Sequence, residues 1–145
     1  MNIVLSIPGE PISQPRQRHA MIAGHVRNYT PAKAPVNAYK YAIQCEAIQH
    51  FHGTPTTKPI KVDIVCVFHR PKSHYRTGKN ADMLKNDVAD WHTTKPDAEN
   101  VAKAILDALT GIAYKDDKQV CELNVSKRYT TDSEQPHTKI GIYHE

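Results

Sequence analysis

Acidic side chains are concentrated in residues 95–120 (KPDAENVAKAILDALTGIAYKDDKQV), and their spacing to one another and to Lys103 could support metal-assisted hydrolysis. In chain order the candidate residues are Asp97, Glu99, Lys103, Asp116 and Asp117. Hydrolysis of a phosphodiester needs a cation that neutralises the phosphate and makes a water nucleophilic, and Mg²⁺ held by carboxylates can do both. A lysine ammonium beside the metal can hydrogen-bond an oxygen whose charge grows in the transition state.

The same residues also have an ordinary structural explanation. Asp97 is a typical helix N-cap, and Glu99 is a typical first-turn acid. Glu99 with Lys103 is a standard pair at i and i+4, which stabilises a helix by roughly 0.2–0.5 kcal/mol. Lys-Asp-Asp-Lys at 115–118 is typical of a surface turn. The pattern alone therefore leaves a nuclease site and a solvated helix surface both open.

The helix that must position these acids has the clearest periodicity in the chain. Its apolar face consists of Val101, Ala104, Ile105, Ala108 and Ile112, which recur at helical spacing. Glu99, Lys103 and Asp107 share the opposite face, which could line a cleft. We expect Asp107 to pair with Lys103 or solvent, and Gly111 to end the helix. Short connections could bring residues 116–117 back toward the helix start.

Strands and helices alternate along the rest of the chain. Alternating apolar residues predict strands at 3–7, 60–68, 121–125 and 140–143, with a short hairpin at 21–29. The strand at 60–68 is apolar on both faces in its later half, which indicates a central position. Helices are predicted at 35–51, 81–91 and from Asp97. The predicted fold is α/β, a single two-layer domain over residues 1–145 with a mixed β-sheet and helices mainly on one face.

Composition and charge favour a soluble domain with an anionic partner. The 145 residues are 39% apolar and 23% charged, which suits one globular domain. The net charge is +4, and the positive residues gather in two zones around the acidic segment. We predict DNA contacts from Arg16, Arg18, Arg27 and Lys33 in the first zone and from Arg70, Lys72 and Arg76 in the second. Such zones attract phosphate backbones.

Neither a membrane span nor a thiolate metal site is expected. No apolar run reaches the length of a spanning helix, and the start of the chain lacks the pattern of a secretion signal. Cys45, Cys66 and Cys121 form no Cys-x-x-Cys pair, and the spacing of the nine His residues fits no ligand pattern. We therefore expect a cytoplasmic protein that makes no membrane contact.

The string PDAENVAKAILDALTGIAYKDDKQV resembles the signature of the RusA family of Holliday-junction resolvases, in which an acid-x-acid-Asn motif opens a helix and Asp-Asp precedes a strand. The opening IPGEPISQPRQR and the Tyr-Thr-Pro at 29–31 are similar to the family as well. By matched position, the resemblance implies that Asp97, Glu99 and Asp117 are catalytic, metal-associated acids. It also implies that Lys103 is the catalytic lysine and that Asp116 assists at the metal. Glu99 is a departure, since well-studied relatives have Asp at this position.

The resemblance implies a Mg²⁺-dependent endodeoxyribonuclease, with Mn²⁺ as an alternative metal. Such an enzyme acts as a homodimer and resolves four-way DNA junctions by symmetric paired nicks in recombination and repair. A bacterial or phage origin is implied as well, including prophages. Two alternatives stay open: a nuclease of flaps or other branched DNA, and a catalytically silent protein that binds branched DNA.

Overall fold

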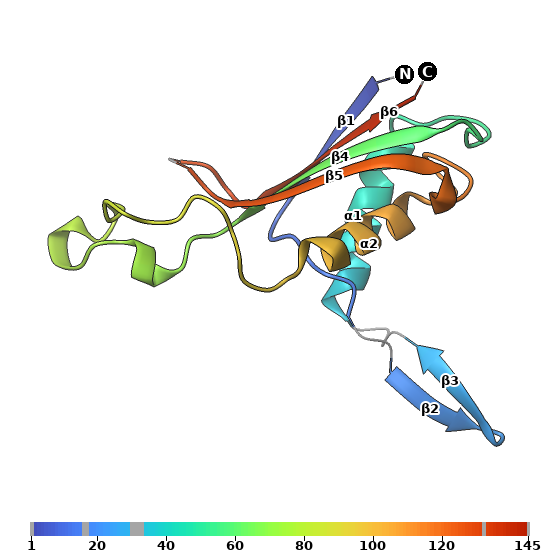
Figure 1. Cartoon of the computed structure of the whole chain (residues 1–145), viewed down its shortest axis with the longest axis horizontal. Coiled ribbons are helices and arrows are strands. Elements are labelled where there is room, and N and C mark those ends of the chain that lie inside the picture. The colour runs from blue at the N-terminus through green and yellow to red at the C-terminus, as the bar shows by residue number, and fades with distance from the viewer. Residues whose placement is uncertain (1, 16–17, 30–33, 132, 145) are drawn as a thin grey trace.

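A mixed four-stranded sheet with two helices on one side forms the body of the protein (Figure 1). The computed structural model describes residues 2–15, 18–29, 34–131 and 133–144. The strands lie in the order β1 (Asn2–Pro8), β6 (His137–Tyr143), β4 (Ile60–Phe68) and β5 (Val120–Tyr129). β4 is parallel to β5, whereas the β1–β6 and β4–β6 pairs are antiparallel. The predicted α/β class, mixed sheet and central place of residues 60–68 are confirmed.

The two faces of the sheet differ because side chains alternate along each strand. On the face toward α1 (Pro35–Ile48) and α2 (Ala98–Leu109), Val62 and Ile64 of β4 are buried in the core. On the other face, the side chain of Asn124 donates to Asp63 at 2.8 Å. Lys61 and Glu122 form an ion pair at 3.1 Å on that face. The sheet thus has an apolar side under the helices and a side with polar pairs that suits water.

Helix α1 begins where predicted but ends three residues early. Pro35 occupies the first helical turn, where its missing N–H costs nothing. The helix ends at Ile48, and the N–H groups of His50 and Phe51 both donate to the carbonyl of Ala47. The predicted end at residue 51 was wrong because these bonds close the helix in a tight turn, which still packs Phe51 against the core.

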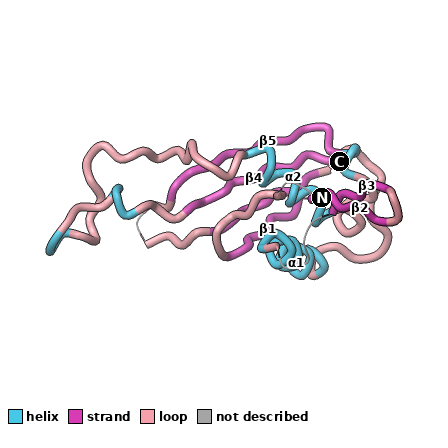
Figure 2. Tube along the Cα trace, turned by 90° about the horizontal axis from the view of Figure 1, so that it is seen from below, coloured by secondary structure: helices cyan, strands magenta, loops and turns pink. Residues whose placement is uncertain are grey.

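Residues 69–95 form a long excursion from the sheet, and Figures 1 and 2 both show it extending away from the body. It contains two short 3₁₀ turns, η1 (Lys72–His74) and η2 (Gly78–Asn80). The predicted helix at 81–91 is absent. The backbone instead folds back on itself, as the N–H of Arg76 donates to Met83 O at 2.8 Å and that of Lys85 to His74 O at 2.9 Å. An excursion beyond the sheet offers no apolar surface on which an amphipathic helix could pack.

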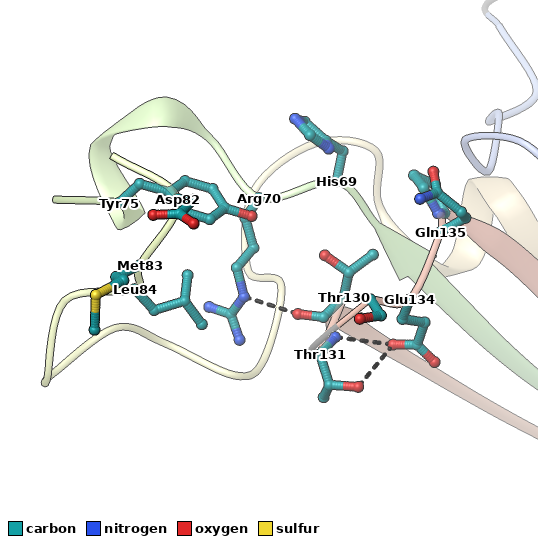
Figure 3. A pocket seen from close by; sticks show the side chains of 12 residues that line it. His69, Arg70, Tyr75, Asp82, Met83, Leu84, Thr130, Thr131, Glu134 and Gln135 are labelled. Carbon is teal, nitrogen blue, oxygen red and sulfur yellow. Dashed lines mark hydrogen bonds between the residues drawn. The ribbon is translucent and has the colours of Figure 1, made fainter. Parts of the chain in front are cut away.

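A buried arginine anchors this excursion. Arg70 is 3% exposed, and its guanidinium donates to Thr130 O and Ala89 O, each at 2.8 Å. The same group lies over the ring of Tyr129, 5.5 Å from its centroid. Figure 3 shows Arg70 in a pocket of about 460 Å³ between the excursion and the β5–β6 connection. Arg70 therefore holds the excursion to the sheet.

A second projection precedes α1. β2 (Arg18–Ile22) and β3 (His25–Tyr29) form an antiparallel hairpin, which confirms the predicted one. Gly24 lies in its turn with a φ of +80°, a conformation that glycine adopts at no steric cost. Figure 1 shows this hairpin standing away from the four-stranded sheet. The body thus carries two projections, the hairpin and the excursion.

His92 fixes the chain between the excursion and α2. Its ring stacks on Phe68 with 3.8 Å between the centroids, and its backbone N–H donates to Lys127 O at 3.0 Å. Burial, and secondarily the charge of Lys127, lower the pKa of His92 below its ordinary value. The neutral ring is therefore the form that this packing stabilises.

Removing buried volume from α2 should strongly destabilise the protein. Ile105 is fully buried, so Ile105→Ala is expected to lower the free energy of unfolding by about 2–5 kcal/mol. Leu123, which is 42% exposed, is the matched control, and Leu123→Ala should cost less than about 1 kcal/mol. Urea denaturation measures both values. Equal losses would contradict the assignment of the core to the α2 side of the sheet.

The stability should fall when the pH drops below the ordinary pKa of histidine, about 6.5. Because the pKa of His92 is lower in the folded chain, the unfolded chain takes up a proton first, and acid favours unfolding. His74, whose pKa is lowered by burial and by Arg70, acts in the same direction. We expect His92→Gln to flatten the decline between pH 7 and 5 in urea titrations. An unchanged slope would contradict this assignment. Glu134 titrates outside this window, since Arg128 holds its pKa at about 2.

Candidate active site

The start of α2 presents three charged side chains that have no partner among the described residues. Asp97 is the N-cap in an extended conformation, Glu99 lies in the first turn, and Lys103 follows one turn later. All three are exposed, and no hydrogen bond or ion pair within the described chain engages their side chains. The opposite side of α2 is buried against the core, which fixes the rotation of the helix. The acids are thus held in place by the helix and remain free to bind a ligand.

Two contacts hold the start of α2 and the residues that lead into it. The ammonium of Lys127 on β5 donates to Thr94 O at 2.7 Å and to Pro96 O at 2.6 Å. The N–H of Gln14, in the loop after β1, donates to Asn100 O at 3.0 Å. Neither contact was predicted from the sequence. The alternation of a strand indicates which face Lys127 lies on, but it does not indicate which distant carbonyl the side chain contacts. Lys127 and Gln14 thus position the segment that carries Asp97 and Glu99.

Asp116 and Asp117 have different tasks in the turn before β5. The carboxylate of Asp116 accepts from Lys118 N at 3.0 Å, and the Asp116 N–H donates to Gln119 Oε1 at 2.8 Å. This capping box orders η3 (Asp117–Gln119). The hydrogen bond from the Lys118 N–H lowers the pKa of Asp116, the main cause of its shift. Asp116 is therefore engaged in the turn, while Asp117 is exposed beside it.

The two halves of the acidic set lie at opposite ends of α2 (Figure 1). The helix has 12 residues and is about 18 Å long, with Asp97 at its start. Asp117 follows its end, where the hydroxyl of Tyr114 donates to Leu106 O at 2.7 Å. The expectation that this turn returns to the helix start was wrong. The chain runs back along β5 and reaches the start of α2 only near the end of that strand, where Lys127 donates to Pro96 O. In the part of the chain that the structure describes, no three His, Cys, Asp or Glu side chains are grouped closely enough to hold a metal.

Asp107 belongs to the packing of the two helices. It accepts from the ammonium of Lys40 on α1 at 2.6 Å. The predicted partners were Lys103 or solvent, and that expectation was wrong, since α1 crosses α2 closely enough for Lys40 to reach the carboxylate. Lys103 therefore stays available at the solvent-facing side of α2.

The residues predicted to contact DNA lie in different parts of the structure. Arg16 and Lys33 lie outside the described residues, and the backbones of Arg18 and Arg27 lie on the β2–β3 hairpin. The burial of Arg70 does not support a phosphate contact, since its donors are used within the fold. On the excursion, Lys72 and Arg76 are exposed, although Arg76 also donates to Asn86 at 3.0 Å. The remaining predicted contacts within the described chain lie on the two projections.

Comparison with known proteins gives the family of the chain. Residues 8–143 match the family described as Endodeoxyribonuclease RusA, nearly the whole sequence. The chain is also 35% identical over 140 residues to the uncharacterized protein YqaN of Bacillus subtilis (strain 168), which covers 97% of this chain and 94% of that protein. The match includes α2 with its acids, the Asp-Asp turn and the strands β4, β5 and β6, and it begins at the last residue of β1. The chain therefore belongs to the RusA family of endodeoxyribonucleases.

Proposed function

We propose that the protein is a Mg²⁺-dependent endonuclease that resolves four-way DNA junctions as a homodimer. Each active site would combine Asp97, Glu99 and Lys103 of one chain with Asp117 of the other. The observation that carries this proposal is the separation of the acids along α2, because one chain cannot bring both halves to a single ion. A second copy can supply the missing carboxylate without any change of fold.

The donor set suits a hard cation once both halves are present. Carboxylate oxygens are the ligands that Mg²⁺ prefers, and Mn²⁺ accepts the same set. The bound ion would neutralise the scissile phosphate and lower the pKa of an attacking water. Lys103, one turn from Glu99, would donate to a non-bridging phosphate oxygen as its charge grows. The longer side chain of Glu99 carries its carboxylate one methylene farther from the helix than an aspartate would.

A four-way junction suits this arrangement better than linear duplex. A symmetric dimer carries two identical sites, which fit the two equivalent strands of a two-fold junction. The hairpin and the excursion, with Arg18, Arg27, Lys72 and Arg76, would bind the phosphates of the junction arms with a steep salt dependence. Selectivity would come from the shape of the branch rather than from base contacts.

Location follows from this substrate. Within the described residues no helix is long and apolar enough to cross a bilayer. We place the activity in the cytoplasm of a bacterium, encoded by the cell or by a phage, where recombination and repair produce junctions.

The first test is cleavage of a synthetic four-way junction beside flap and linear duplex DNA. With Mg²⁺ or Mn²⁺ we expect paired, symmetric nicks in the junction, which EDTA abolishes. Asp117→Asn removes a carboxylate charge and should lower the cleavage rate by roughly 100-fold or more while leaving junction binding intact. Asp82→Asn, which changes an exposed acid on the excursion, is the matched control and should cleave at the wild-type rate.

The other outcomes separate the alternatives. Equal cleavage of flaps and junctions would indicate a nuclease of branched DNA in general. Tight junction binding without nicks under either metal would refute the nuclease, and Glu99→Asp would then show whether the longer acid is the cause.

Lys103 should contribute to the chemical step rather than to binding. We expect Lys103→Ala to lower kcat by roughly 100-fold, because a donor to the transition-state charge is lost, with little change in the junction Kd. Lys139→Ala, on the open side of the sheet, controls for the loss of one positive charge. Single-turnover cleavage and gel-shift titration measure the two quantities. A loss confined to binding would assign Lys103 to the DNA-contact surface instead.

A further inference from the structure

Trp91 is a large aromatic side chain that the fold leaves uncovered. It is the single tryptophan of the chain, and it is 63% exposed. Within the described residues its indole makes no hydrogen bond and no ring contact. Isolated apolar residues on a surface are ordinary, but an indole is the side chain with most to gain from being covered. A tryptophan held in the open at a fixed place is therefore suited to stacking on a ligand.

The backbone on both sides of Trp91 is fixed to the sheet. The segment around Trp91 runs antiparallel to the end of β5. The N–H of Tyr129 donates to Asp90 O at 2.9 Å, and the N–H of His92 donates to Lys127 O at 3.0 Å. Both neighbours of Trp91 in the chain are thus tied to β5, so the backbone beneath the indole is held in place.

The indole lies on the face of the sheet away from the helices. Trp91 is paired with Arg128, and paired residues of antiparallel neighbours share a face. Arg128 follows Lys127 on β5, and the ammonium of Lys127 reaches the start of α2 on the helix side. Because successive side chains of a strand alternate, Arg128 and Trp91 lie on the other side. Arg128 donates to Glu134 at 2.6 and 2.8 Å, so its guanidinium is occupied and the indole stays open.

Lys127 also sets the position of Trp91 relative to the proposed active site. Its carbonyl accepts from the residue after Trp91, and its ammonium donates to Pro96 O, next to Asp97. Six residues separate Trp91 from Asp97, a span of at most about 21 Å when fully extended. Under the proposed function, a base stacked on the indole would lie within about six nucleotides of the cut phosphate, at about 3.4 Å per base step.

The charge of this segment favours a nucleic acid as the ligand. Between Trp91 and Asp97 the chain carries Lys95 and no acid, and Lys95 is exposed. A cation beside an open aromatic ring is the combination that binds single-stranded nucleic acid, in which the ring stacks on a base and the cation contacts the backbone. The ring and Lys95 are thus placed to contact the same DNA strand.

We propose that Trp91 stacks on a nucleobase that the branch point of the DNA leaves uncovered, and that this contact favours junctions over linear duplex. The inference rests on the proposed function for the identity of the ligand. Each base inside a duplex already stacks on both sides, whereas bases at an open branch point have a free face. Aromatic side chains stack on such faces without reading the sequence, which agrees with selectivity by the shape of the branch.

The fluorescence of Trp91 gives the direct test, because no other tryptophan contributes. The full-length Asp117→Asn chain with Mg²⁺ would be titrated with a four-way junction and, separately, with linear duplex, so that binding is measured without cleavage. At saturation the junction should quench the emission strongly and the duplex should quench it little. Unchanged emission in the junction complex, or equal quenching by both DNAs, would overturn the proposal.

Two substitutions at this position separate stacking from packing. Trp91→Phe keeps an aromatic face, whereas Trp91→Leu keeps an apolar side chain without one. In gel-shift titrations Trp91→Leu should raise the junction Kd by roughly 10-fold without changing the duplex Kd, and Trp91→Phe should retain most of the affinity. Because Trp91 is exposed, both variants should match the wild type in urea denaturation. Wild-type junction affinity in Trp91→Leu, or equal losses in both variants, would contradict stacking.

Failure of the nuclease proposal is recognised separately. Quenching by junctions in a wild type that nicks none would refute cleavage and support the stacking. Paired nicks without quenching would refute the stacking and support the nuclease.

Discussion

The length and rigidity of α2 govern the arrangement of the proposed site. Its buried face, with Val101, Ile105 and Leu109, locks the helix onto the sheet, so neither its rotation nor its position can change at low cost. Asp97 and Glu99 are fixed at one end, and the turn with Asp117 is fixed at the other by bonds from Gln119 to the loop before β4. The same packing that orders each half keeps the halves apart in one chain.

This separation has an electrostatic benefit. Carboxylates gathered at one point repel each other when no cation is present, and their desolvation is costly. In the single chain Asp97, Glu99 and Asp117 remain exposed, while Asp116 takes the capping role that the turn needs. Under our proposal the repulsion arises only when two chains pair, where a divalent cation offsets it. Metal binding and pairing of the chains would then be thermodynamically linked.

Local pattern predicted the elements well and their spatial relations less well. The strand at 60–68 and the helix after Asp97 follow from alternation and periodicity, and the structure has both. The prediction of a helix at 81–91 failed because its apolar residues have no surface on which to pack. Whether such a surface exists depends on the tertiary structure. The buried role of Arg70 and the hydrogen bonds of Lys127 also depend on partners far along the chain. The candidate acids were chosen from their type and spacing. Their separation to opposite ends of α2 could be seen only once the direction of β5 was known.

The most direct test of an active site shared between chains is complementation between two inactive variants. Asp97→Asn and Asp117→Asn would be co-expressed with different tags, and the mixed dimer would be purified and assayed on a four-way junction. If the site is shared, one site of the mixed dimer carries both substitutions and the other carries none. The account therefore predicts that the mixed dimer nicks one strand while each parent dimer is inactive. A mixed dimer as inactive as its parents would show that each chain uses its own Asp117, which would contradict the account.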